Sequence, residues 1–191
     1  MAGGQEAFFA FRDLALLVLK LTVLRSPQGS VRLTQGTAPG TFALGGWNGP
    51  DDPLPLNDDR YLRLSIALYL EDTPHGSRLK VSEAGYQYQT DRDGDEWIFR
   101  YDYVRHPPDP HPASHLHIRA APTVNCLPPH ETLGRVHFPT GRVAIEAIIR
   151  LLADQFGVRC NEPPEVWRPV LAESERLFLA IAHQPHQAPP G

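Results

Sequence analysis

Alternation of apolar and polar residues marks the middle of the chain as a series of strands. Every second residue from position 62 to position 70 is a leucine or an isoleucine, a period that places these side chains on one face of a strand. Residues 78–90 continue in the same style, and Gly85 is where we expect a β-bulge. Asp93-Gly94 predicts a hairpin turn into a strand over residues 96–103, and a short strand follows at 115–119.

After position 140 the apolar period changes to that of a helix. Ile145, Ile148, Ile149, Leu152 and Phe156 recur at helical spacing. Thr140 is the expected N-cap of this helix, and Gly157 is placed to end it. Glu146 precedes Arg150 by four residues, which predicts an exposed ion pair. A second helix is predicted over residues 165–182.

The first 60 residues fit less regular patterns. Residues 6–24 are apolar, and their periodicity does not separate a buried helix from a strand. Residues 26–60 are rich in glycine, proline and aspartate, which predicts a long connection with a short hairpin near 30–44.

Taken together, the patterns predict a single α+β domain over residues 1–184. Residues 1–60 would supply the apolar element and the long loop, residues 61–119 the antiparallel strands, and residues 140–182 two helices. Residues 185–191 are expected to be a flexible tail. The predicted architecture is an antiparallel sheet of about four or five strands with helices packed on one face.

Composition narrows the class of protein. The chain has 191 residues, of which 41% are hydrophobic and 21% charged, as in ordinary globular proteins. Its net charge of −4 argues against a non-specific nucleic-acid binder, which is normally basic, so RNA could be held only by a local patch. The apolar stretch 14–24 is too short to span a bilayer, and acidic residues precede it, unlike a signal sequence. We expect a soluble, cytoplasmic protein without membrane association.

Candidate chemistry concentrates in the histidine-rich segment 100–119. Two-residue spacing in a strand points His115, His117 and Arg119 one way and the intervening apolar residues toward the core. Pairing with the strand 96–103 would bring Arg100 and Asp102 to the same face. We expect this face to be exposed, so replacing either histidine by alanine should leave folding almost unchanged.

The segment allows three interpretations. Two histidines and an arginine suit RNA cleavage without a metal, since one histidine can accept a proton, the other can donate one, and guanidinium binds phosphate. His-x-His also suits a metal, with His106 or His111 as a third ligand. Alternatively, these histidines are simply polar residues of a solvated sheet face. Arg142 lies at the start of the first predicted helix, where backbone N–H groups can receive an anion or merely form a cap.

The order of these motifs resembles the TumE-like toxin family of bacterial toxin–antitoxin modules. The likeness is carried by Tyr86-Gln87-Tyr88, by the strand from Trp97 to Asp102, and by His115-Leu116-His117, over about residues 78–157. The helix 140–156 looks like the family's closing helix. The resemblance implies a small α+β toxin that acts on RNA or translation and is restrained by a cognate antitoxin. It carries over four positions as site residues: Arg100, Asp102, His115 and His117.

The hypothesis is therefore an RNase-like toxin that cleaves RNA without metal or other cofactor. The alternatives are a histidine-rich metal-binding protein or a non-catalytic adaptor in a bacterial defence or regulatory complex. The expected partners are an antitoxin and an RNA substrate, and no oligomeric state is predicted. The candidate catalytic residues are Arg100, Asp102, His106, His115, His117 and Arg119, and the candidate binding residues are Arg105, His111 and Arg142.

Overall fold

The computed structural model describes residues 2–25, 31–36, 38–74, 76–119 and 138–182. Within them, eight strands form one antiparallel sheet, in the order β1-β2-β4-β5-β6-β7-β8, with β3 also pairing with β4. The strands are β1 (Val31–Gln35), β2 (Thr41–Gly46), β3 (Leu54–Pro55), β4 (Tyr61–Thr73), β5 (Gly76–Gln89), β6 (Trp97–Val104), β7 (Ser114–Ile118) and β8 (Phe138–Pro139). The helices are α1 (Ala2–Leu21), α2 (Ile145–Asp154) and α3 (Pro164–Ala182).

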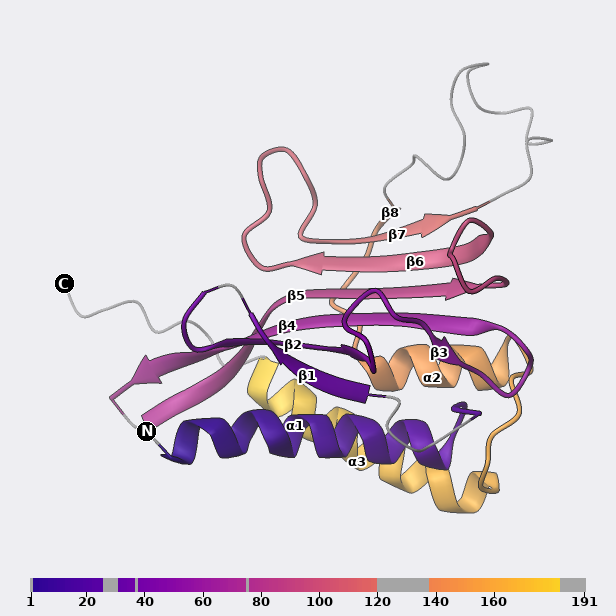
Figure 1. Ribbon diagram of the computed structural model, residues 1–191, viewed down its shortest axis with the longest axis horizontal. Coiled ribbons are helices and arrows are strands. Elements are labelled where there is room, and N and C mark those ends of the chain that lie inside the picture. The colour runs from indigo at the N-terminus through magenta and orange to yellow at the C-terminus, as the bar shows by residue number, and fades with distance from the viewer. Residues whose placement is uncertain (1, 26–30, 37, 75, 120–137, 183–191) are drawn as a thin grey trace.

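The predicted α+β class with helices on one face of an antiparallel sheet is confirmed, although the sheet has more strands than the predicted four or five. Figure 1 shows α1 beside β1, with α3 next to α1, whereas β6 and β7 lie farther from these two helices. None of the described helices is long and apolar enough to cross a membrane. The predicted tail, residues 185–191, lies outside the described residues.

The two longest strands, β4 and β5, form the centre of the sheet. The alternation in β4 is confirmed, because Leu62, Leu64, Ile66 and Leu68 are at most 2% exposed and face the helices. The register between the two strands shifts between Ala67 and Leu68, whose partners are Glu83 and Val81. The irregularity therefore falls at Ser82, and the bulge predicted at Gly85 is wrong.

The first 60 residues are more regular than their composition indicates. The N-terminal apolar stretch is one helix, α1, with Phe8 and Leu19 in the core. The hairpin expected near 30–44 is confirmed by the pairing of β1 with β2. Glycine enrichment here reflects close packing, since a Cβ on Gly46 would lie only 2.0 Å from the carbonyl oxygen of Asp52. These strands enlarge the sheet beyond the predicted number.

The start of α2 differs from the prediction. Its N-cap is Ala144, which makes no side-chain capping hydrogen bond. Thr140 instead follows β8, and its N–H donates to the Ser114 carbonyl at 3.1 Å. The predicted cap is wrong because the chain stays extended beside β7 before it turns helical. Gly157, with φ of +68°, lies just beyond the helix, as predicted.

The predicted exposed pair between Glu146 and Arg150 is also wrong. Glu146 is only 3% exposed and accepts a hydrogen bond from the Ser174 hydroxyl. Arg150 pairs instead with Glu175 of α3, at 2.7 Å. The helix–helix contact between α2 and α3 replaces the pairing that spacing along one helix favours.

Candidate active site

The strand register places two polar rows on the face of the sheet that points away from the helices. Residues directly opposite one another across β4, β5, β6 and β7 form each row. The first row contains Ser65, Gly85, Asp102 and His115, and the second contains Arg63, Gln87, Arg100 and His117. The predicted sharing of one face by Arg100, Asp102 and both histidines is therefore confirmed.

Asp102 lies at the centre of this group. Its Oδ2 accepts a hydrogen bond of 2.6 Å from Nε of Arg100. The same oxygen is 3.6 Å from Nε2 of His115 and 3.7 Å from Nε2 of His117. One carboxylate oxygen thus faces three nitrogen-bearing side chains, two of which are imidazoles, the side chains that most often accept and donate protons in catalysis.

The two histidines are buried, in contrast to the predicted exposed face. His115 is 3% and His117 6% exposed. The His115 ring packs edge-on against His111 at 4.6 Å and against His117 at 4.8 Å. Ile118, expected in the core, is 39% exposed. The histidines form a packed layer on the outer face, so shortening them would remove contacts that support the fold.

A hollow opens over these rows, and we call it the outer depression. A side chain at Gly85 would narrow it, because a Cβ there would lie 3.5 Å from Oδ1 of Asp102. Glycine at this position leaves one side of the carboxylate open. The polar residues that line the outer depression are Ser65, Glu83, Arg100, Asp102, His111, His115 and His117.

Arg100 is placed to bind an anion in the outer depression. Its side chain is 47% exposed, and its Nε is engaged by Asp102. Among the described residues, its two terminal nitrogens form no hydrogen bond. A guanidinium held at Nε keeps these two donors for a phosphate group, which such donors bind well.

Four other sequence candidates lie outside the outer depression. Arg119 pairs with Glu96 at 3.1 Å, at the β5–β6 hairpin. His106 is exposed and does not line the hollow. Arg105 and Arg142 line a separate cavity on the helix side of the sheet. Of the sequence candidates, His111 therefore lies with Arg100, Asp102 and the His-x-His pair. The remaining candidates, Arg105, His106, Arg119 and Arg142, lie elsewhere.

Asp102, His115 and His117 could also hold a metal ion. One ligand atom from each lies within 4.8 Å of the other two, and two histidines with a carboxylate suit zinc and similar ions. Within the described part of the chain this group offers Asp102 as the third ligand, in place of the His106 or His111 expected from the sequence. Arg100 already binds Oδ2 of Asp102 and would compete with a metal for that atom.

Gly85 and Ser65 are site positions that sequence reasoning missed. The signal for Gly85 was a glycine within a strand, which indicates either a bulge or close approach of another group. Only the register shows that the second explanation applies, because it places Asp102 directly opposite.

A family model described as Toxin TumE matches residues 54–155, slightly more than half of the 191 residues. The chain belongs to this family. No curated protein and no solved structure matches it. The matched segment runs from β3 through α2, so it contains both polar rows and extends the resemblance seen from the sequence back to β3 and β4. TumE membership supports a role as the toxin component of a toxin–antitoxin module, which implies a cognate antitoxin as partner.

Proposed function

We propose that this TumE-family toxin cleaves RNA in the outer depression without a metal ion. The observation that carries the proposal is the convergence of Arg100, His115 and His117 on one oxygen of Asp102. These groups supply a proton acceptor, a proton donor and a phosphate-binding cation within one hollow. An RNA substrate and an antitoxin partner would place its action in the cytoplasm.

In the proposed reaction, one histidine accepts the proton of a 2′-hydroxyl as its oxygen attacks the adjacent phosphorus. The bond from phosphorus to the 5′-oxygen breaks, and the second histidine gives its proton to that oxygen. The products are a 2′,3′-cyclic phosphate and a 5′-hydroxyl. Protons balance, because one histidine gains the proton that the other loses.

Asp102 and Arg100 have supporting roles in this mechanism. Asp102 holds both imidazoles in place and stabilises whichever one is protonated. The terminal nitrogens of Arg100 bind the phosphate and stabilise the charge that develops on it. The net charge of −4 favours these local contacts over general attraction to the RNA backbone.

Controlled expression in a bacterial host tests this proposal. Wild-type toxin should arrest growth and generate RNA fragments with cyclic-phosphate ends, and co-expression of the cognate antitoxin should prevent both. The variant Arg100→Gln should lose the effect, whereas Arg119→Gln, which changes an arginine outside the depression, should retain it. Growth arrest with intact RNA would contradict RNA cleavage.

A divalent-metal centre is a second candidate, favoured by the close approach of Asp102, His115 and His117. Elemental analysis of the purified protein separates the two candidates. About one metal ion per chain in wild-type protein, lost in His117→Gln, would support the metal centre. Metal-free protein that cleaves RNA would support the acid–base mechanism.

A further inference from the structure

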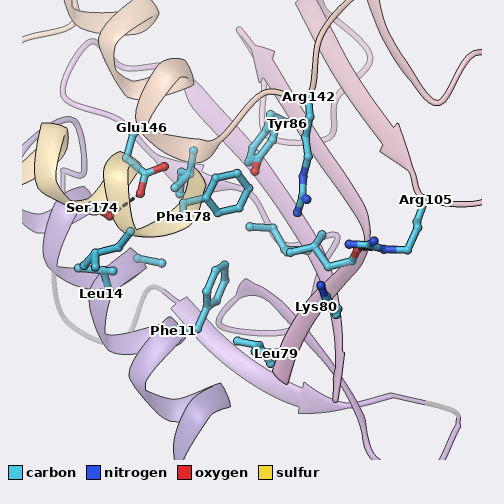
Figure 2. A pocket seen from close by; sticks show the side chains of 15 residues that line it. Phe11, Leu14, Leu79, Lys80, Tyr86, Arg105, Arg142, Glu146, Ser174 and Phe178 are labelled. Atoms are coloured by element: carbon cyan, nitrogen blue, oxygen red, sulfur yellow. Dashed lines mark hydrogen bonds between the residues drawn. The ribbon is translucent and has the colours of Figure 1, made fainter. Parts of the chain in front are cut away.

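A cavity lies between the sheet and the helices, on the face of β5 opposite to the outer depression. We call it the interlayer cavity, and Figure 2 shows its lining. About 690 Å³ of space there is free of protein atoms, a volume that includes the part open to solvent. Its walls are mainly apolar, with Phe11 and Leu14 from α1, Leu79 from β5 and Phe178 from α3.

Two arginines form one end of the interlayer cavity. Nε of Arg105 donates to the Val81 carbonyl at 2.9 Å. The Arg142 guanidinium lies over two rings, 4.6 Å from Tyr103 and 4.7 Å from Phe178. Neither arginine forms an ion pair with a carboxylate in the part of the chain that the structure describes. Burial lowers the pKa of Arg142, and the charge of Arg105 adds to this effect.

The opposite end of the cavity is acidic but does not supply a balancing charge. In Figure 2, Glu146 and Ser174 lie together, away from Arg105. Burial raises the pKa of Glu146, which favours its neutral form. Its second oxygen, Oε2, is buried and has no hydrogen-bond partner among the described residues. Among the described residues, Arg105 and Arg142 are therefore left without a carboxylate partner, whereas Lys80, which also lines the cavity, pairs with Glu71 at 3.5 Å.

We propose that the interlayer cavity binds a small amphiphilic carboxylate of the medium-chain fatty-acid class. The carboxylate would lie between Arg105 and Arg142. An anion stabilises a partly buried guanidinium most strongly when the guanidinium has no other ion pair. The alkyl chain would pack among the apolar walls formed by Phe11, Leu14, Leu79 and Phe178. Gly85 and Tyr86 are consecutive residues that face opposite sides of β5, so this site is distinct from the proposed RNA site.

Calorimetric titration of the full-length protein with decanoate, below its micelle concentration, tests the proposal. Wild-type protein should bind decanoate in a saturable manner and should melt at higher temperature with it. Decanol and decylamine, which share the chain but lack the carboxylate, should bind at least about tenfold more weakly, as expected when a charged group loses its partner.

Variants assign the binding to the cavity. Arg105→Gln and Arg142→Gln should each weaken decanoate binding by at least about tenfold, whereas Arg119→Gln, at an exposed position just after β7, should not change it. Because Arg142 packs against two rings, Arg142→Gln could disturb the fold. In that case the effect of Arg105→Gln still tests the proposal. Absence of binding by wild-type protein would overturn the proposal. So would equal binding of decanoate and decanol with no effect of either arginine variant.

Discussion

Nε2 of His115 lies 3.6 Å from Oδ2 of Asp102, and the two residues are direct cross-strand partners. Backbone hydrogen bonds between β6 and β7 fix the two Cα positions, so the imidazole and the carboxylate meet without help from a loop. Groups carried by strands hold their geometry better than groups carried by loops. This relationship underlies the account of the outer depression as an active site.

His115→Gln and His117→Gln should each slow RNA cleavage by about 10²–10⁴-fold, because each removes one proton-transfer group. Both histidines are buried, so each variant should also lower the free energy of unfolding by roughly 1–3 kcal/mol. Cleavage rates and urea unfolding should be measured on the same preparations. Full activity in both folded variants would exclude the histidines from catalysis.

Substitutions at Gly85 test whether the outer depression is the place where substrate binds. Gly85→Ala should be tolerated, because the added Cβ would be in ordinary contact with Asp102, at 3.5 Å. Gly85→Leu should fill the hollow and block cleavage while the protein stays folded, as thermal melts can verify. A fully active leucine variant would place the substrate elsewhere.

Arg100 and Arg119 form a matched pair for the phosphate-binding role. Arg100→Gln should reduce the cleavage rate by about 10²–10³-fold, as removal of a charge-stabilising donor does in other enzymes. Arg119→Gln should change it little, since Arg119 pairs with Glu96 at the hairpin. Steady-state kinetics on an oligoribonucleotide measure both effects. Equal losses in the two variants would argue against a specific role for Arg100.

That four residues share one face could be predicted from the sequence, because strand periodicity and the pairing of β6 with β7 are enough to determine it. These residues are Arg100, Asp102, His115 and His117. Burial of the two histidines could not be predicted, since strand periodicity does not reveal packing of their rings on each other or of the His115 ring on His111, from the loop between β6 and β7.

Contacts across the sheet and between helices also could not be predicted from the sequence pattern. The Glu146–Ser174 contact joins α2 to α3, and spacing along one helix favoured a different partner for Glu146. The β1–β2 hairpin was expected, but glycine-rich β2 and the short β3 made their region look like a loop. Close packing around Gly46 explains that composition.

Glu146→Gln should make stability less dependent on pH. Burial raises the pKa of Glu146 in the folded state, so the unfolded chain ionises first as pH rises. The contribution of Glu146 to the free energy of unfolding is therefore complete at a pH below its pKa in the unfolded chain. This contribution is lost as pH rises toward its pKa in the folded protein. Glutamine cannot ionise, so the variant should gain stability relative to wild type as pH rises from 4 to 8. The groups facing this carboxyl are Ser174 and Glu175 of α3, Arg150 of α2 and Tyr86 of β5.

Urea unfolding across that pH range measures the effect, and Glu173→Gln on α3 is the control. Glu173 is exposed, and its hydrogen bond with Arg176 lowers its pKa, so its replacement should not produce the same gain with rising pH. A constant difference between wild type and Glu146→Gln at every pH would contradict ionisation of a buried Glu146.

The rate of RNA cleavage in excess EDTA, compared between purified wild-type toxin and the Asp102→Asn variant, distinguishes metal-free acid–base catalysis in the outer depression from metal-dependent cleavage. Asparagine preserves the shape of the side chain but removes the charge that faces His115, His117 and Arg100. The account predicts that wild-type toxin cleaves RNA equally well with and without EDTA, and that folded Asp102→Asn cleaves it at least about 10²-fold more slowly. Cleavage that EDTA abolishes and a divalent metal restores, or an Asp102→Asn variant with wild-type activity, would contradict it.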